Sequence, residues 1–130
     1  MSTIKTFEEL DAWKVSRELC SKIGVLIDGG CFGKNFKLIG QMEGSSGSIM
    51  DNIAKGFERG TRLEFIQFLG YSKGSCGELR SQLYRALDRK YIIKEQFDEY
   101  CSLAVRISGM LQKFISYLQK SEIQGERKKT

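Results

Sequence analysis

Apolar residues recur along this chain at intervals of three and four positions, which is the spacing of one face of an α-helix. Four such stretches are separated by short breaks that contain glycine or charged residues. The fourth stretch is the most regular, and its apolar positions are Phe97, Tyr100 or Cys101, Ala104, Ile107, Leu111, Phe114 and Leu118. No stretch alternates apolar and polar residues as a half-buried strand would. The pattern therefore predicts an all-α fold.

Local signals predict where these helices begin and end. Residues 6–9 (Thr-Phe-Glu-Glu) have the spacing of a capping box, so we expect the first helix to begin there and to stop at the glycine pair 29–30. Asn35 is a predicted N-cap for a second helix that ends near Arg59. A second capping box at residues 61–64 (Thr-Arg-Leu-Glu) opens the third helix.

The connection between the second and third helices is very short. Two long helices joined by so few residues pack as antiparallel neighbours. We therefore predict an antiparallel up-down-up-down four-helix bundle over residues 1–120, followed at residues 121–130 by a short basic, disordered tail.

Glycine is unusually frequent inside the second and third predicted helices. Each glycine in a helix interior costs about 0.8–1 kcal/mol relative to alanine. At 100° per residue, Gly40, Gly44 and Gly47 fall on the face opposite Met42, where small residues allow a second backbone to approach. We interpret these three glycines as a subunit interface. The alternatives are a helix that tolerates exposed glycine and a helix that is broken near residues 44–48.

Polar residues also recur at helical spacing on the second and third helices. Ser48, Asn52, Ser75 and Glu78 are candidates for a hydrogen-bonded polar seam, because buried polar groups need partners. Such a seam would fix the register of the two helices, and a solvated face is the alternative. A catalytic role for Glu78 is disfavoured, because no second acid, metal-ligand set or nucleophile–base pair accompanies it.

The composition narrows the function classes. The chain of 130 residues has no histidine, which removes Ser-His-Asp, Cys-His and His-zinc chemistry. We expect no enzymatic activity, no small-molecule substrate, no cofactor and no metal. Its four cysteines form no C-x-x-C pair, residues 1–5 contain no apolar signal segment, and no apolar run approaches the length of a membrane span. The chain is therefore expected to be cytoplasmic, with no membrane partner.

The net charge of +5 is concentrated in the middle of the chain, where residues 34–94 carry eleven basic and six acidic residues. Basic residues gather at the two ends of the third helix; they are Lys55, Arg59 and Arg62 at one end and Arg85, Arg89, Lys90 and Lys94 at the other. Such clusters attract the phosphates of RNA or DNA. Because no aromatic stacking motif interleaves them, we expect recognition by shape and charge. An acidic protein surface is the competing partner, and charge alone does not separate the two.

Four segments resemble the four-helix-bundle proteins encoded in 23S rRNA intervening sequences. They are FEELDAWK at residues 7–14, SIMDNIAKG at 48–56, FIQFL at 65–69 and GSCGEL at 74–79. The chain departs from the family pattern at Lys55, where glutamate is usual, and it lacks the Phe-Pro that often precedes the second helix. The resemblance implies a ring-like homopentamer with no established enzymatic activity.

The chain is also similar to the accessory variability determinant of diversity-generating retroelements, a basic pentameric barrel that binds a reverse transcriptase and nucleic acid. Together with the basic clusters, this resemblance predicts a non-enzymatic homo-oligomeric scaffold that binds nucleic acid, with a reverse transcriptase as a further expected partner. The alternative is a purely protein-binding or structural oligomer encoded in an rRNA intervening sequence.

Overall fold

A computed structural model describes residues 4–129 of the chain, with side chains up to residue 121. The elements are a 3-10 helix η1 (Phe7–Glu9) and the helices α1 (Asp11–Asp28), α2 (Phe36–Glu58), α3 (Arg62–Asp88) and α4 (Lys94–Lys129). No strand occurs within residues 4–129. The predicted all-α fold with four helices is therefore confirmed.

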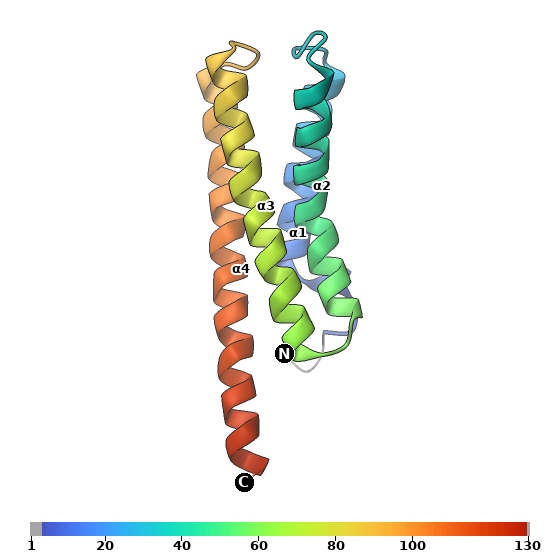
Figure 1. Ribbon diagram of the computed structural model, residues 1–130, viewed down its shortest axis with the longest axis vertical. Helices are drawn as coiled ribbons and strands as arrows, with labels where there is room; N and C mark the ends of the chain where they lie inside the picture. Colours follow the sequence, from blue (N-terminus) through green and yellow to red (C-terminus); the bar gives the residue numbers. More distant parts are fainter. Residues whose placement is uncertain (1–3, 130) are drawn as a thin grey trace.

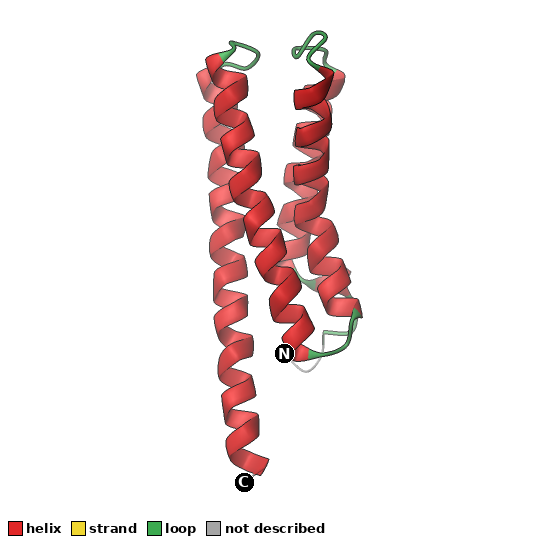
Figure 2. Ribbon diagram, in the orientation of Figure 1, coloured by secondary structure: helices red, strands yellow, loops and turns green. Residues whose placement is uncertain are grey.

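The four α-helices lie beside one another, and each packs on two neighbours. α1 contacts α2 and α4, and α3 contacts the same two helices. The loops α1–α2 and α3–α4 lie at one end of the molecule, whereas the α2–α3 turn and both chain termini lie toward the other end (Figure 1). Figure 2 shows that the connections between the helices are short loops. Residues from two separate loops are thereby gathered at one end.

Two predicted helix starts are confirmed by their hydrogen bonds. Thr61 is the N-cap of α3, and its side-chain oxygen accepts from the backbone N–H of Glu64 at 3.2 Å. Asn35 is the N-cap of α2, and its side-chain oxygen accepts from the N–H of Leu38 at 3.1 Å. Each cap satisfies a donor that the helix itself leaves free.

The first helix begins later than expected. The Glu9 carboxylate accepts from the N–H groups of Lys5 and Thr6 at 2.9 Å each, so the predicted capping box is present. It caps the 3-10 helix η1, because Leu10 then adopts an extended conformation with ψ 126°. Leu10 is buried in the core, and α1 starts only at Asp11. Burial of this leucine favours the change of chain direction between η1 and α1.

The predicted core stripe of α4 is largely confirmed. Phe97, Ala104, Ile107 and Leu111 are buried. Phe114 is only half-buried and packs at the edge of the core. The buried residues of α1 are Ala12, Ser16, Leu19, Ile23 and Leu26. Trp13 and Cys20 on the same helix are half-buried.

The polar contacts between α2 and α3 are made by other residues than the predicted seam. The hydroxyl of Ser45 donates to the side-chain oxygen of Gln82 at 2.6 Å, and the hydroxyl of Ser72 donates to the carbonyl of Ile49 at 2.6 Å. All three polar side chains are buried. Each hydroxyl has a hydrogen-bond partner, either a side chain or a backbone carbonyl, as buried polar groups require.

The predicted seam residues lie beside this buried row. Glu78 is exposed and Ser75 is half-buried, while the Asn52 amide donates to the Ser48 carbonyl within α2 at 2.9 Å. The prediction that these four form one seam is wrong. On α3 the inward face passes through Leu79, and Glu78 is rotated about 100° away from it.

Helix α4 continues as helical backbone to Lys129, beyond the domain boundary predicted at residue 120. The side chains of residues 122–130 lie outside the described residues, so the predicted basic, disordered tail at 121–130 stays a prediction. None of the helices in the described part of the chain is long and apolar enough to cross a membrane.

Candidate nucleic-acid interface

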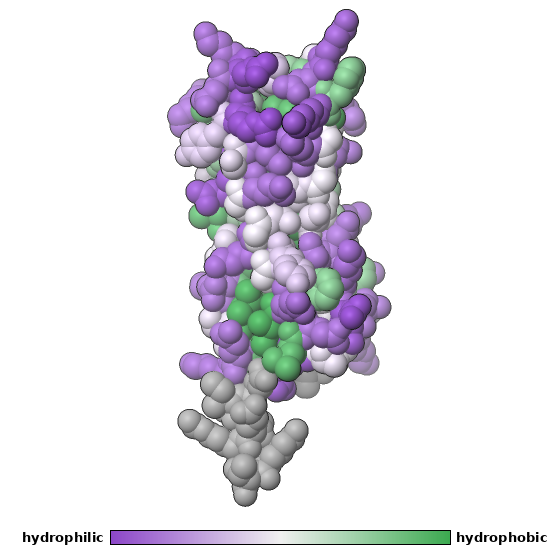
Figure 3. Space-filling model, in the orientation of Figure 1, coloured by the Kyte–Doolittle hydropathy of each residue, from purple (hydrophilic) through white to green (hydrophobic). Residues whose placement is uncertain are grey.

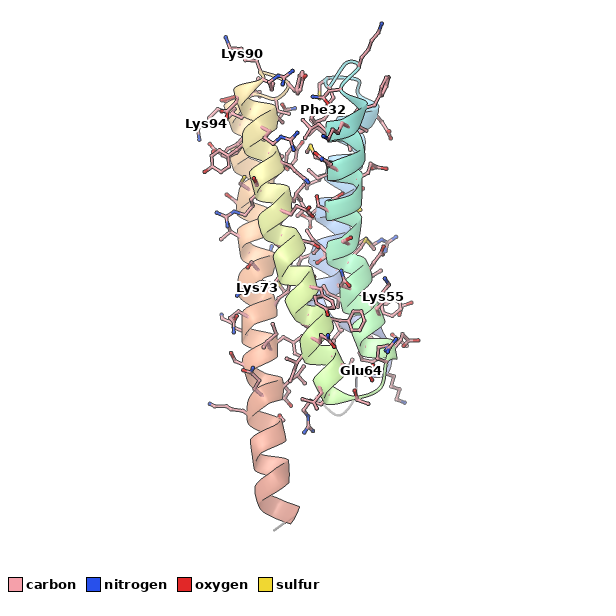
Figure 4. The ribbon with its side chains drawn as sticks, in the orientation of Figure 1. Phe32, Lys55, Glu64, Lys73, Lys90 and Lys94 are labelled. Atoms are coloured by element: carbon pink, nitrogen blue, oxygen red, sulfur yellow. The ribbon has the colours of Figure 1, made fainter. Side chains whose placement is uncertain are left out.

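The two predicted basic clusters occupy opposite ends of the bundle. Lys55 lies near the α2–α3 turn, whereas Lys90 and Lys94 lie at the end formed by the α1–α2 and α3–α4 loops (Figure 4). All seven predicted phosphate-binding residues are exposed. The clusters are therefore separate surfaces, and each can be assessed by its own contacts.

The cluster at the α2–α3 turn is partly neutralised. Arg59 forms an ion pair with Glu64, with 2.7 Å between Nε and Oε2, and its guanidinium also lies over the ring of Phe68. The hydrogen bond from Arg59 lowers the pKa of Glu64, with a further contribution from Thr61. Lys55 and Arg62 make no ion pair within the part of the chain that the structure describes. Two of the three cations therefore remain without an ion-pair partner among the described residues at this end.

At the opposite end, residues of two loops and of α3 line a shared hollow of about 620 Å³, which we call the basic groove. Its lining residues are Phe32, Gly33, Lys34, Asn35, Arg85, Arg89 and Tyr91. The outer surface of this end is mostly hydrophilic (Figure 3). Gly30 and Gly33 take positive φ angles of 81° and 57°, which allow the α1–α2 loop to reverse direction.

The chain positions the groove residues by local and long-range contacts. Arg85 and Arg89 are four residues apart near the end of α3, so they share one face of the helix. The Asn35 amide donates to the Tyr91 hydroxyl at 3.3 Å and joins the two loops. Arg85 donates to the side-chain oxygen of Gln41 at 2.8 Å, a neutral partner that leaves its charge uncompensated.

The cations of the groove make no ion pair in the described part of the chain, although Asp88 lines an adjoining hollow together with Arg85 and Arg89. Lys34, Arg85 and Arg89 form no ion pair among the described residues. Lys94, which the sequence also assigned to this cluster, is paired with Asp98 at 2.5 Å, and that contact raises the pKa of the lysine. Asp98 was not identified from the sequence as an acid that neutralises the charge of Lys94. The remaining positive charge is concentrated in the groove, with Lys90 close by in the loop.

Sequence reasoning missed Lys34, Asn35 and Tyr91 as site residues. Asn35 and Tyr91 are 56 positions apart, and only the folded bundle brings their loops together. No aromatic stacking motif was found among the basic residues of the sequence, whereas the structure places Phe32 and Tyr91 in the lining of the groove. Tyr91 follows Lys90 directly in the sequence, but Phe32 lies on a different loop, and only the fold brings the two rings together.

Lys90 occupies a backbone conformation that normally favours glycine. Its φ is 62°, and it follows the C-cap of α3. The Tyr91 N–H donates to the Ala86 carbonyl at 2.9 Å and the Lys90 N–H donates to the Leu87 carbonyl at 3.0 Å. This pattern is a Schellman motif, in which glycine is the usual residue at the position of Lys90. A lysine is present here despite its conformational cost, beside a groove that gathers cations.

Replacing Lys90 with glycine is expected to raise the free energy of unfolding by about 1 kcal/mol, because glycine carries no steric penalty at positive φ. Lys90→Ala is the matched control, since it removes the same charge but keeps a side chain at this position. Denaturant midpoints of the two variants measure the difference. Equal midpoints for glycine and alanine would contradict a strained Lys90.

The predicted interface glycines are open to solvent in the single chain. Gly40 and Gly44 are exposed and Gly47 is half-buried, and a Cβ added at any of them would meet no atom within 4 Å. Helix α2 continues through residues 44–48, so the alternative of a broken helix is wrong. The subunit interface itself stays a prediction.

Two observations on the described residues concern metal-ligating groups and the buried thiol. No group of three or more cysteine, aspartate and glutamate side chains in this part of the chain could hold a metal ion. Cys76 is buried, and burial raises the pKa of its thiol to about 12. At neutral pH this thiol stays protonated, so it acts as a small apolar residue of the core.

The fold places the chain in the class of all-α proteins built from four helices. Residues 8–113 match the family model described as 23S rRNA-intervening sequence protein, and the chain belongs to this family. No curated protein matches the chain.

A solved structure supports the fold. It is the crystal structure of a protein of unknown function from the S23 ribosomal protein family of Bacteroides thetaiotaomicron. The two chains share 24% sequence identity with a TM-score of 0.75, and the similarity covers 80% of this chain and 97% of that chain. At this level of identity the likeness concerns the fold alone.

Proposed function

We propose that the protein is a non-enzymatic, cytoplasmic scaffold that binds the phosphate backbone of RNA or DNA in the basic groove. The observation that carries this proposal is the convergence of Lys34, Arg85 and Arg89 from two separate segments without an ion pair among the described residues. Cations held together in a concave surface focus the electrostatic potential more strongly than scattered ones. The positive φ of Lys90 supports the same reading, because a strained cation lies next to this surface.

The scaffold is proposed to act as a ring-like homopentamer of up-down-up-down bundles, with the exposed glycine face of α2 as subunit interface. Cyclic symmetry would repeat the groove in each subunit, so that a modest charge per chain becomes a strong field per assembly. A reverse transcriptase of a diversity-generating retroelement is the proposed protein partner. A reverse-transcriptase gene with a template repeat beside the coding sequence would support the retroelement setting. A location of the coding sequence inside an rRNA gene would instead support a protein encoded in an rRNA intervening sequence.

The groove is tested by binding of RNA and DNA oligonucleotides across a salt series. An Arg85/Arg89/Lys90 triple-alanine variant should bind more weakly than wild type. The slope of log affinity against log salt should become shallower by about 2 to 3, since each lost phosphate contact reduces it by roughly 0.7–0.9. Fluorescence anisotropy of an end-labelled oligonucleotide measures both quantities.

A second triple variant controls for the change in total charge. Lys14, Arg106 and Lys120 are exposed on α1 and α4, away from the groove residues, and their replacement by alanine removes the same three charges. This variant should keep nearly the wild-type salt slope. Equal losses in both variants would show that only net charge matters. No binding by wild type at low salt would overturn the proposal in favour of a purely protein-binding or structural oligomer.

Self-association is tested separately by light scattering. A pentamer of the 14.8 kDa chain has a mass of about 74 kDa, and we expect wild type to reach this value at micromolar concentration. Gly44→Leu places a bulky side chain on the exposed face of α2 and should dissociate the ring. Gly109→Leu places the same side chain on the exposed face of α4 and serves as the control. A monomeric wild type would disprove the oligomer.

A further inference from the structure

Aromatic and cationic side chains form a column that leads from the core into the basic groove. Phe32 is 1% exposed, and its ring centroid lies 5.5 Å from that of Tyr91. The guanidinium of Arg89 lies over the Tyr91 ring at 5.8 Å from the centroid. Figure 4 shows Phe32 at the same end of the molecule as Lys90. The column therefore begins at a buried anchor and ends at an exposed guanidinium.

The column is held in place before any ligand arrives. Phe32 fixes one side of Tyr91, and the Asn35 amide donates to the hydroxyl of this tyrosine. Tyr91 in turn provides a flat surface for Arg89, so the arginine has fewer rotamers to lose on binding. These contacts pack the two loops together and also present the Arg89 guanidinium in a fixed position at the groove.

We infer that the basic groove selects single-stranded nucleic acid, with Arg89 stacking on an unpaired base while Lys34 and Arg85 contact its flanking phosphates. This inference rests on the proposed function and specifies its ligand. Guanidinium planes and aromatic rings stack on unpaired bases, which a duplex keeps inside its own stack. Lysine carries the same charge but lacks the plane, so Arg89 has a role that charge alone does not supply.

Charge and stacking predict opposite preferences, which makes the inference testable. A duplex has the higher charge density, so binding by charge alone favours duplex over a single strand of equal length. Stacking by Arg89 reverses this order. One base stack contributes about tenfold, part of which offsets the preference of charge for the duplex, so we expect wild type to bind a single-stranded adenine-rich 20-mer about threefold more tightly than the corresponding duplex.

Two variants separate the plane of Arg89 from its charge. Arg89→Lys keeps the charge, and Tyr91→Leu removes the ring beneath the guanidinium. Each should lose about tenfold in affinity for the single strand and stay within about twofold of wild type for the duplex and for inorganic polyphosphate. Tyr91→Phe retains the ring and is the matched control, which should keep most of the preference.

A 2-aminopurine base in the single strand gives a direct readout of stacking, because its fluorescence is quenched when it stacks. Wild type should quench it, and Arg89→Lys should quench it much less at saturating protein. Equal affinity of wild type for single strand and duplex, with Arg89→Lys unchanged, would overturn the inference and leave the proposed function standing. Absence of binding to either nucleic acid would overturn both.

Discussion

Truncating Leu111 to alanine is expected to lower the free energy of unfolding by about 2–5 kcal/mol. Leu111 is 0% exposed and lies on the buried stripe of α4 between Ile107 and Ile115. Removal of its side chain loses the transfer free energy of the apolar atoms and leaves a cavity that close-packed neighbours fill only in part. Equilibrium denaturation at a fixed protein concentration measures the change.

The exposed Arg106 on the same helix provides the control. Arg106→Ala makes a comparable truncation in the same secondary-structure context and should stay within about 0.5 kcal/mol of wild type. An unchanged denaturation midpoint for Leu111→Ala would show that this face of α4 does not form the core. The fold would then have to be reassigned at its most regular helix.

Features that depend on nearby residues were predictable from the sequence. The caps at Asn35 and Thr61 involve partners three residues away, so the sequence spacing carries the geometry directly. The buried stripe of α4 follows from one periodic pattern. The capping box at residues 6–9 was found correctly, but its extent was misjudged because burial of Leu10 interrupts the helix at once.

The groove depends on contacts that no local pattern encodes. Arg85 and Arg89 were predicted as part of one cluster from their positions in the sequence, whereas Lys34 lies on a different loop and joins them only in the folded bundle. The polar row between α2 and α3 was misassigned for a related reason. Glu78 is exposed and the next residue, Leu79, is buried, so a rotation of α3 by one residue would interchange their positions. The spacing of the polar residues alone does not determine that rotation.

Among the glycines of α2, only Gly56 lies where a neighbouring helix comes close to the backbone. A Cβ built on Gly56 would lie 2.8 Å from Cβ of Phe68 and 2.9 Å from a ring carbon of Phe65. The ring of Phe65 can turn aside, whereas Cβ of Phe68 is fixed to the backbone of α3. An alanine at position 56 therefore forces α2 and α3 apart near their shared turn. The rings of Phe57 and Phe65 pack edge to face in the same region.

Gly56→Ala is accordingly expected to destabilise the protein by about 1–3 kcal/mol through overpacking, although alanine is the better helix former. Gly109→Ala is the matched control, because Gly109 is exposed on α4 and an added Cβ there meets no atom within 4 Å. That variant should gain about 0.5–1 kcal/mol. Denaturant midpoints of the two variants, measured side by side, test these opposite expectations: the midpoint should fall for Gly56→Ala and rise for Gly109→Ala. A stabilised Gly56→Ala variant would show that α2 and α3 tolerate a side chain at their point of closest approach.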